Sequence, residues 1–218
     1  MIDIEKLSKA FGNRTLWSDV TFTVGRGEMV ALVGPSGSGK STLLNCLGLL
    51  DMPSAGAIRH EGKDVTRFGR REIRRFRRDI LGYLFQNYAL MENATVATNL
   101  KVAVTPRQAS QGKTSTSIAE ALDRVGLAGR EQEKIYHLSG GEQQRVALAR
   151  LMVKEPALVL ADEPTGALDH AHTTMVVDIL REMSKAGCAV VIATHNNDVR
   201  DRCDTVFALK DSFLVGSP

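Results

Sequence analysis

The residues with the clearest chemical potential form one glycine-rich stretch, Gly34-Pro35-Ser36-Gly37-Ser38-Gly39-Lys40-Ser41-Thr42. An apolar run precedes it and another follows it, which predicts a strand, a tight turn and a helix. The glycines would let backbone N–H groups approach a triphosphate, and the helix would direct its N-terminus at the phosphates. Lys40 would contact the β/γ oxygens, and the Ser41 hydroxyl would ligate Mg²⁺. The stretch is therefore interpreted as a phosphate-binding loop, or P-loop.

Two acids follow the apolar strand predicted over 157–161, at Asp162 and Glu163. Adjacent side chains of a strand point to opposite sides, so these two carboxylates can take different roles. Asp162 could hold the Mg²⁺ shell, and Glu163 could polarise a water for attack on the γ-phosphorus. The alternative is a pair of surface caps at a strand end, and the P-loop earlier in the chain favours the catalytic interpretation.

Two more polar side chains lie at strand ends. His195 comes just after the predicted strand 188–193, and Gln86 ends the predicted strand 80–85. Ligands of open α/β sheets bind at the carboxyl ends of the strands, so His195 could contact the γ-phosphate and the attacking water. The Gln86 amide could contact Mg²⁺ or water without adding charge. A lone histidine is otherwise more often structural.

The stretch Leu138-Ser139-Gly140-Gly141-Glu142-Gln143-Gln144-Arg145 opens a helix predicted over 140–154. Its serine and glycines would form a second anion-binding helix start. Two such starts in one chain could serve one nucleotide within a monomer, or one nucleotide held between two chains.

Together these motifs resemble the nucleotide-binding subunit of ABC transporters over essentially the whole chain. The matches, in chain order, are Walker A at 34–42, the Q-loop at Gln86, the signature motif at 138–145, Walker B at 158–163, the D-loop at Ala167-Leu168-Asp169 and the H-loop at His195. The resemblance implies a head-to-tail homodimer with two ATP molecules at its interface. Ser139 and Gly141 of one chain would then cap the γ-phosphate held by Lys40 of the other.

The resemblance also implies the roles of the site residues. Glu163 would be the general base, and Phe11 would stack on adenine. The expected catalytic residues are Glu163, His195, Gln86 and Lys40, and the expected metal ligands are Ser41, Gln86 and Asp162. The expected ATP-binding residues are Phe11, Gly34, Pro35, Ser36, Gly37, Ser38, Gly39, Lys40, Ser41, Thr42, Ser139 and Gly141.

Shorter matches resemble the MacB- and LolD-like branch, which exports lipoproteins and macrolides. They are Ala161–Asp169 and Leu84–Gln86, and the segment 86–90 also resembles ATPases of antimicrobial-peptide exporters. Two positions depart from this pattern. Glu92-Asn93-Ala94 stands where the branch often has a proline after a leucine pair, and Asn196 stands where aspartate is usual.

Hydrophobic periodicity predicts the fold. Alternation at 2–7 and 20–24 indicates a small antiparallel sheet, whereas the run 29–33 and those before Gln86, Asp162 and His195 indicate a parallel sheet. Edge strands are predicted at 205–209 and 213–215, and further helices at 95–104, 115–126 and 172–184. We expect an α/β fold of the P-loop NTPase (RecA-like) class, with a small antiparallel β subdomain and an inserted α-helical subdomain. Residues 1–218 would form one domain, with 1–86 and 155–218 in the core and β subdomain and 87–154 in the helical subdomain.

Composition limits the function classes. Charge is nearly balanced, with 28 basic and 25 acidic residues, which argues against a nucleic-acid binder. The segment 67–78 nevertheless holds seven arginines. It could be a surface for anionic lipid or a partner, or a solvated helix with Ile73 and Phe76 turned inward, which is favoured. Three scattered cysteines (Cys46, Cys188 and Cys203) indicate buried thiols in a reducing cytosol.

The leading hypothesis is an ATP-hydrolysing subunit that powers a separate membrane permease, as an exporter of peptides, lipoproteins or drugs. It would use ATP and Mg²⁺, and it would be cytoplasmic, peripheral on the inner face of the membrane and in contact with that membrane only through the permease. The second hypothesis is a soluble ABC ATPase of cofactor assembly, such as an iron–sulfur scaffold. A DNA-repair or ribosome-associated protein is disfavoured by the lack of a long coiled coil, a second cassette or a strong basic excess.

Overall fold

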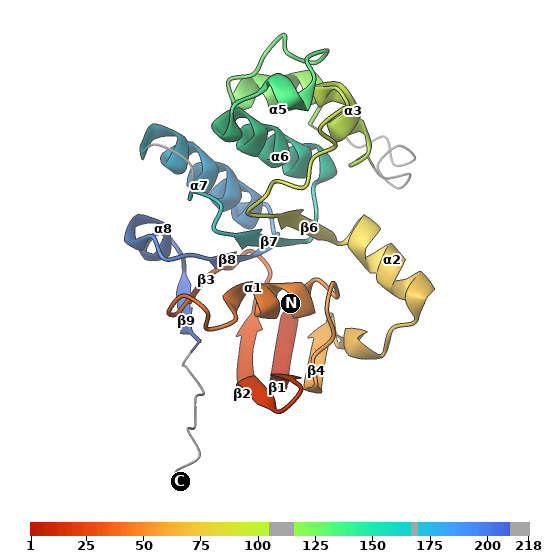
Figure 1. The fold of residues 1–218 in the computed structure, drawn as a ribbon, viewed down its shortest axis with the longest axis vertical. Helices are drawn as coiled ribbons and strands as arrows, with labels where there is room; N and C mark the ends of the chain where they lie inside the picture. The colour runs from red at the N-terminus through yellow and green to blue at the C-terminus, as the bar shows by residue number, and fades with distance from the viewer. Residues whose placement is uncertain (105–115, 167–169, 210–218) are drawn as a thin grey trace.

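A five-stranded parallel sheet lies at the centre of the fold (Figure 1). The structure is a computed structural model that describes residues 1–104, 116–166 and 170–209. The strand order is β6-β7-β8-β3-β9. The strands are β3 (Met29–Val33), β6 (Leu81–Leu84), β7 (Leu158–Asp162), β8 (Ala189–Ala193) and β9 (Thr205–Ala208). All four strand pairings are parallel. The predicted parallel sheet is therefore confirmed.

The N-terminal strands form a separate antiparallel sheet with the order β2-β1-β4-β5. Its strands are β1 (Ile2–Phe11), β2 (Arg14–Val24), β4 (Ala55–His60) and β5 (Lys63–Asp64). β1 and β2 are longer than predicted, because their hairpin closes between Phe11 and Arg14 and leaves only Gly12 and Asn13 in the turn. Register shifts along the hairpin interrupt the alternation that marks a strand in the sequence.

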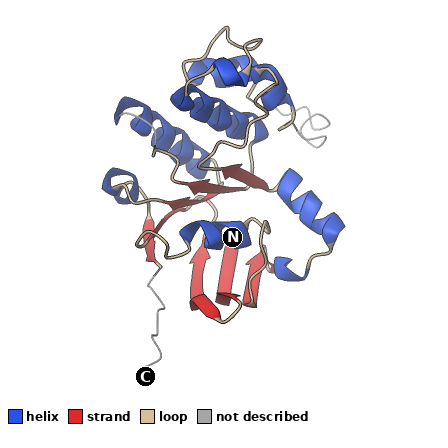
Figure 2. Cartoon of the chain, viewed as in Figure 1, coloured by secondary structure: helices blue, strands red, loops and turns tan. Residues whose placement is uncertain are grey.

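The helices cover both faces of the parallel sheet (Figure 2). They are α1 (Lys40–Leu47), α2 (Arg70–Asp79), α3 (Val96–Lys101), α5 (Ile118–Arg124), α6 (Gly140–Lys154), α7 (His170–Lys185) and α8 (Asn197–Asp201), with short 3₁₀ turns at Val65–Arg67 and Ile135–His137. α1 lies between the two sheets, whereas α6 and α7 lie on the other side of the parallel sheet. None of the helices in the described ranges is long and apolar enough to cross a membrane.

Strand β7 divides its side chains between two hydrophobic cores. Leu158 and Leu160 belong to the core that contains α1 and the antiparallel sheet. Val159 and Ala161 belong to the core that contains α3, α5, α6 and α7. Because side chains alternate along a strand, an all-apolar strand can serve a core on each face.

The boundaries of several predicted elements change. α3 and α5 are shorter at both ends than the predicted helices 95–104 and 115–126. Their starts are set by Thr95 and Ser117, which act as N-caps. α8 was not predicted, and the Asn196 side chain caps it by accepting the N–H groups of Asp198 and Val199. The predicted strand 213–215 and the D-loop 167–169 lie outside the described residues. The division into subdomains at 87 and 154 stays a prediction.

Candidate nucleotide-binding site

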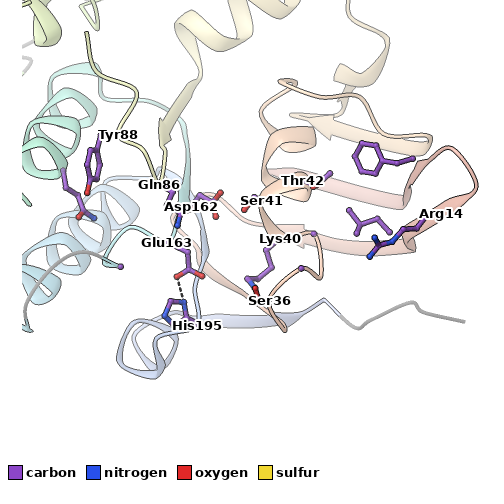
Figure 3. Close-up of a pocket in the computed structure, with 16 residues that line it drawn as sticks. Arg14, Ser36, Lys40, Ser41, Thr42, Gln86, Tyr88, Asp162, Glu163 and His195 are labelled. Atoms are coloured by element: carbon purple, nitrogen blue, oxygen red, sulfur yellow. Dashed lines mark ion pairs between the residues drawn. The ribbon is translucent and has the colours of Figure 1, made fainter. Parts of the chain in front are cut away.

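A cavity of about 1050 Å³ lies where strands of the parallel sheet end (Figure 3). It is lined by Phe11, Arg14, Leu16, Ser36, Gly37, Gly39, Lys40, Ser41, Thr42, Gln86, Tyr88, Gln144, Asp162, Glu163, Gly166 and His195. The predicted catalytic and metal-binding residues all line this cavity, because parallel strands bring their carboxyl ends to one edge of the sheet. Ser139 and Gly141 are not among its lining residues.

The glycines of the P-loop leave room for a ligand. Gly37 and Gly39 have φ of +81° and +89°, which side-chain-bearing residues rarely adopt. A Cβ on Gly39 would lie 2.6 Å from Leu16 Cδ2 and 2.8 Å from Trp17 Nε1, so no side chain fits there. A Cβ on Gly37 would meet no atom within 4 Å. The loop is therefore packed against β2 at Gly39 and open at Gly37.

Two hydrogen-bond donors of the loop, Lys40 and Ser38, lie at the start of α1. Lys40 Nζ donates to the carbonyl oxygens of Gly34 at 2.8 Å and Pro35 at 3.0 Å, which holds the ammonium over the loop. An ammonium has three donors, so one remains for an anion. The Ser38 hydroxyl is buried without a hydrogen-bond partner in the described structure. An anion-binding loop fits both observations.

Ser41 and Asp162 are, with Gln86, the residues predicted to bind a metal ion. Both residues line the cavity. Asp162 is only 8% exposed, and this burial raises the pKa of its carboxyl group, while the nearby Ser41 hydroxyl and the Lys40 charge oppose the rise. Gln86 lies beside them (Figure 3). A hydroxyl, a carboxylate and an amide oxygen form the hard donor set that suits Mg²⁺, so these residues fit the expected ion.

Glu163 and His195 are joined by a short contact. Glu163 Oε2 lies 2.8 Å from His195 Nδ1 (dashed line in Figure 3), and the Glu163 side chain is 17% exposed whereas that of His195 is 75% exposed. Glu163 has a left-handed φ of +48°, and its N–H donates to Ala193 O at 2.9 Å. Such a conformation costs about 1–3 kcal/mol in a residue with a side chain. The pair can accept a proton from a water and keep the carboxylate oriented.

Arg150 is a positioning residue that the sequence did not indicate. Its Nη1 donates to Ala89 O at 2.7 Å and its Nη2 to Tyr88 O at 2.9 Å. Tyr88 and Ala89 have left-handed φ of +61° and +46°. Burial lowers the pKa of the Arg150 guanidinium. Arg150, on α6, therefore holds the strained turn that follows Gln86.

Gln144 is a second residue that sequence reasoning missed. It is 2% exposed and lines the cavity from α6. Its Nε2 donates to Pro164 O, and its Oε1 is buried with no hydrogen-bond partner among the residues that the structure describes. Gln144 thereby connects α6 to the turn that follows Glu163. Only the signature motif itself, which includes Gln144, could have drawn attention to it.

The start of α6 is already a closed capping box. Ser139 Oγ accepts the Glu142 N–H at 3.3 Å, and Glu142 Oε2 accepts the Ser139 N–H at 2.7 Å and its hydroxyl at 2.8 Å. These bonds and that of Arg130 lower the pKa of Glu142 to about 2. Because Ser139 is exposed and outside the cavity, the geometry favours the interpretation of one nucleotide held between two chains.

Phe11, the last residue of β1, also lines the cavity. It is 55% exposed, and Lys9 Nζ lies 4.8 Å from its ring centroid. Arg14 and Leu16 of β2 line the cavity as well, and Figure 3 shows Arg14 on the side away from His195. An exposed ring at a cavity mouth can stack on a flat base, as the sequence analysis expected.

The comparison with known proteins agrees with this geometry. The profile described as "ABC transporter" matches residues 17–166. The chain belongs to the ABC transporter family. The predicted family, the P-loop NTPase fold and the assignment as an ABC-transporter ATPase are therefore confirmed.

Curated relatives are proteins named macrolide export ATP-binding/permease protein MacB. One from Paracoccus denitrificans is 40% identical over 91% of this chain and 30% of its own length. One from Escherichia coli is 36% identical over 99% of this chain and 34% of its own length. The chain thus spans about a third of the curated relatives that it matches, and the predicted resemblance to the MacB-like branch is confirmed.

Two solved structures of the ATP-binding cassette MJ0796 are similar over 97% of this chain and 95% of theirs. One, a dimer in a post-hydrolysis state bound to ADP and Pi, is 31% identical with a TM-score of 0.85. The other, a dimer described as a bacterial ABC transporter cassette, is 32% identical with a TM-score of 0.86.

Proposed function

We propose that the cavity binds Mg-ATP and hydrolyses it, and that hydrolysis drives a membrane exporter. The observation that carries this proposal is the Glu163–His195 contact of 2.8 Å in the cavity that also holds Lys40 and the Ser41–Asp162 pair. A base, a cation for the phosphates and a site for Mg²⁺ are the components that phosphoryl transfer to water requires.

ATP binding would use both ends of the cavity. The N–H groups at the start of α1 and the Lys40 ammonium would bind the β- and γ-phosphates, and Phe11 would stack on adenine. Ser41, Asp162 and Gln86 would hold Mg²⁺, which supplies charge neutralisation at the phosphate oxygens. The open space at Gly37 and the donor set of these residues support this arrangement.

Hydrolysis would begin with Glu163 accepting a proton from the water that attacks the γ-phosphorus. The new bond joins the water oxygen to phosphorus, while the bond between phosphorus and the ADP oxygen breaks. His195, through Nδ1, would hold the carboxylate in position, and its exposed ring would contact the γ-phosphate. The proton on Glu163 then leaves to solvent or to the product phosphate. Arg150 acts indirectly by fixing the turn after Gln86.

The complete site would form between two copies of this chain. Ser139 and Gly141 lie outside the cavity that contains Lys40, so they would act on the nucleotide of a second chain. The two related cassettes described as dimeric support this homodimer. To contact a phosphate, Ser139 would exchange its hydroxyl bond to Glu142 for one to the γ-phosphate.

The partner would be a membrane permease, and the relatives named macrolide export proteins support an export role. A groove of about 270 Å³ beside Ala89 is lined by Leu50, Arg77, Leu81, Gly82, Tyr83, Phe85, Ala89, Val102, Ala103, Arg150, Leu151 and Lys154. A permease segment seated there would contact the turn held by Arg150, and so would sense the position of Gln86. The chain would thereby be peripheral on the cytoplasmic face of the membrane.

The proposal is tested with Glu163→Gln, measured by steady-state ATPase assay and by size-exclusion chromatography with light scattering. We expect turnover to fall about 10²–10⁴-fold, since a general base contributes that much. ATP binding should persist, and Mg-ATP should convert the variant from monomer to dimer. The matched control is Glu92→Gln, an exposed glutamate outside the cavity, which should keep normal turnover. Retained turnover in Glu163→Gln would remove Glu163 from the role of base.

A further inference from the structure

Helix α2 presents an unbroken face of arginine. Its sequence is RREIRRFRRD, and at about 100° per residue the side chains of Arg70, Arg74, Arg78, Arg71 and Arg75 fall within an arc of about 140°. All five residues are exposed. No other residue type lies within this arc, which differs from the mixed charges of an ordinary solvated helix face.

The opposite face of α2 fixes this orientation. Phe76 is 5% exposed, and Ile73 packs against the same hydrophobic core as α1. The inward placement of Ile73 and Phe76 that the sequence favoured is therefore confirmed. Because the helix is anchored along its apolar side, the arginine face cannot turn toward the core.

Most of these positive charges are not neutralised by carboxylates of the described residues. Arg78 makes a two-bond ion pair with the Asp79 carboxylate. Within the described residues, the structure gives no carboxylate within 4 Å of Arg70, Arg71, Arg74 or Arg75. The Glu72 carboxylate accepts the Gly69 N–H at 2.9 Å instead of pairing with an arginine. Adjacent cations repel one another, so this face is complementary to an external anionic surface.

We propose that the arginine face of α2 binds the anionic phospholipid headgroups of a membrane surface. One guanidinium group can bind two oxygens of a phosphate at once. Several guanidinium groups on one helix face therefore suit a flat array of phosphates. A single-stranded nucleic acid would instead use a basic groove with aromatic stacking platforms, whereas this face carries arginine alone. The lipid contact adds to the permease-mediated contact that the sequence analysis expected.

The position of α2 agrees with this partner. α2 lies at the rim of the molecule next to β6, the edge strand of the parallel sheet (Figure 1). Arg77 of α2 lines the groove proposed for the permease, together with the exposed side chains of Leu50 and Val102. A permease docked there would bring the arginine face close to the bilayer. This orientation rests on the proposed function, but the charge of the face does not.

The experiment is flotation of the purified chain with two kinds of vesicle. One kind is phosphatidylcholine alone, and the other contains about 30% phosphatidylglycerol, which supplies a negative surface. We expect binding only to the anionic vesicles, and weaker binding as the salt concentration rises from about 0.05 to about 0.3 M. The triple variant Arg70→Gln/Arg71→Gln/Arg74→Gln should bind about a hundredfold more weakly, since each cation near such a surface contributes about fivefold.

The matched control removes three exposed charges elsewhere, as Lys6→Gln/Lys134→Gln/Lys185→Gln. Anionic-vesicle binding by this control within about threefold of the native chain supports the proposal. Equal loss in the two triple variants would reduce the effect to net charge and overturn it. Equal binding to neutral vesicles, or tighter binding to a single-stranded DNA oligomer at the same salt, would also overturn it. ATPase activity of the α2 variant is measured alongside, and we expect it to be unchanged. This ATPase measurement reports on the proposed function, whereas vesicle flotation reports on the lipid proposal, so failure of one can be told from failure of the other.

Discussion

Replacing Arg150 tests whether the turn after Gln86 must be held for catalysis. Arg150→Met keeps the unbranched apolar stem of the side chain but removes the hydrogen bonds of 2.7 and 2.9 Å to Ala89 O and Tyr88 O. Each bond from a charged donor contributes about 1.5–3 kcal/mol. The two left-handed residues cost about 1–2 kcal/mol each, and this strain is no longer opposed. The desolvation of the guanidinium offsets part of the loss.

These terms leave a net loss of about 2–3 kcal/mol in the stability of the ordered turn, which lowers the ratio of ordered to disordered turn by about 30–150-fold. We expect kcat for ATP hydrolysis to fall about 10–100-fold. KM for ATP should stay within about threefold, because Arg150 does not line the nucleotide cavity. Arg150→Lys should recover part of kcat, since an ammonium can reach one of the two carbonyls.

The assay is steady-state phosphate release over a range of ATP concentrations, with a thermal melt of each variant as a control for folding. A kcat within twofold of the native value would refute the argument that Arg150 holds a catalytically required turn. A parallel rise in KM would also refute it, because that result would indicate damage to the nucleotide site itself.

The remaining predictions concern the nucleotide, the second chain and the thiols. Lys40→Ala should weaken ATP binding itself, measured by isothermal titration calorimetry, and undiminished affinity would remove Lys40 from the phosphate site. Ser139→Arg should leave ATP binding intact but block hydrolysis and ATP-dependent dimerisation, and normal turnover would exclude a shared site. Burial raises the pKa of the Cys46 thiol to about 12, so iodoacetamide at pH 8 should modify it far more slowly in the folded chain than in urea. Since this pKa is raised above the ordinary thiol value of 9.0, the associated stability is full below about pH 9 and declines as pH rises toward 12, which melts over this range would detect.

The cavity could be predicted because its residues belong to local patterns. The P-loop follows β3, Asp162 is the last residue of β7 and Glu163 comes directly after it. A strand followed by a turn is readable from a few neighbouring residues. Parallel topology then brings those strand ends together without any further information. The same reasoning brings Gln86 and His195 to this edge, and both line the cavity in the structure.

Other features could not be predicted because they depend on distant contacts. Arg150 contacts carbonyl groups 61 and 62 residues earlier in the chain, and nothing in the sequence near Arg150 distinguishes it from a solvated helix arginine. α8 escaped prediction because its five residues show no helical period, and its cap at Asn196 became evident only from the hydrogen bonds. The uncertain function of 67–78 had the same origin, since only the fold shows which arginines lie without partners.

The close fit of Gly39 against Leu16 and Trp17 makes the phosphate loop and the β1–β2 hairpin one mechanical unit. Phe11 is carried by the same hairpin, so the distance from the loop to that ring is fixed by the length of the strands. The hairpin would thereby set the spacing between the phosphate contacts and the base contact of a bound nucleotide. Adding two residues to each strand between Trp17 and the hairpin turn would keep the ring on the same face and move it by about 6.6 Å relative to the loop. Such a change would alter which base can stack on the ring, while phosphate binding by the loop would stay the same. Inorganic polyphosphate has no base, so its binding would depend on the loop alone.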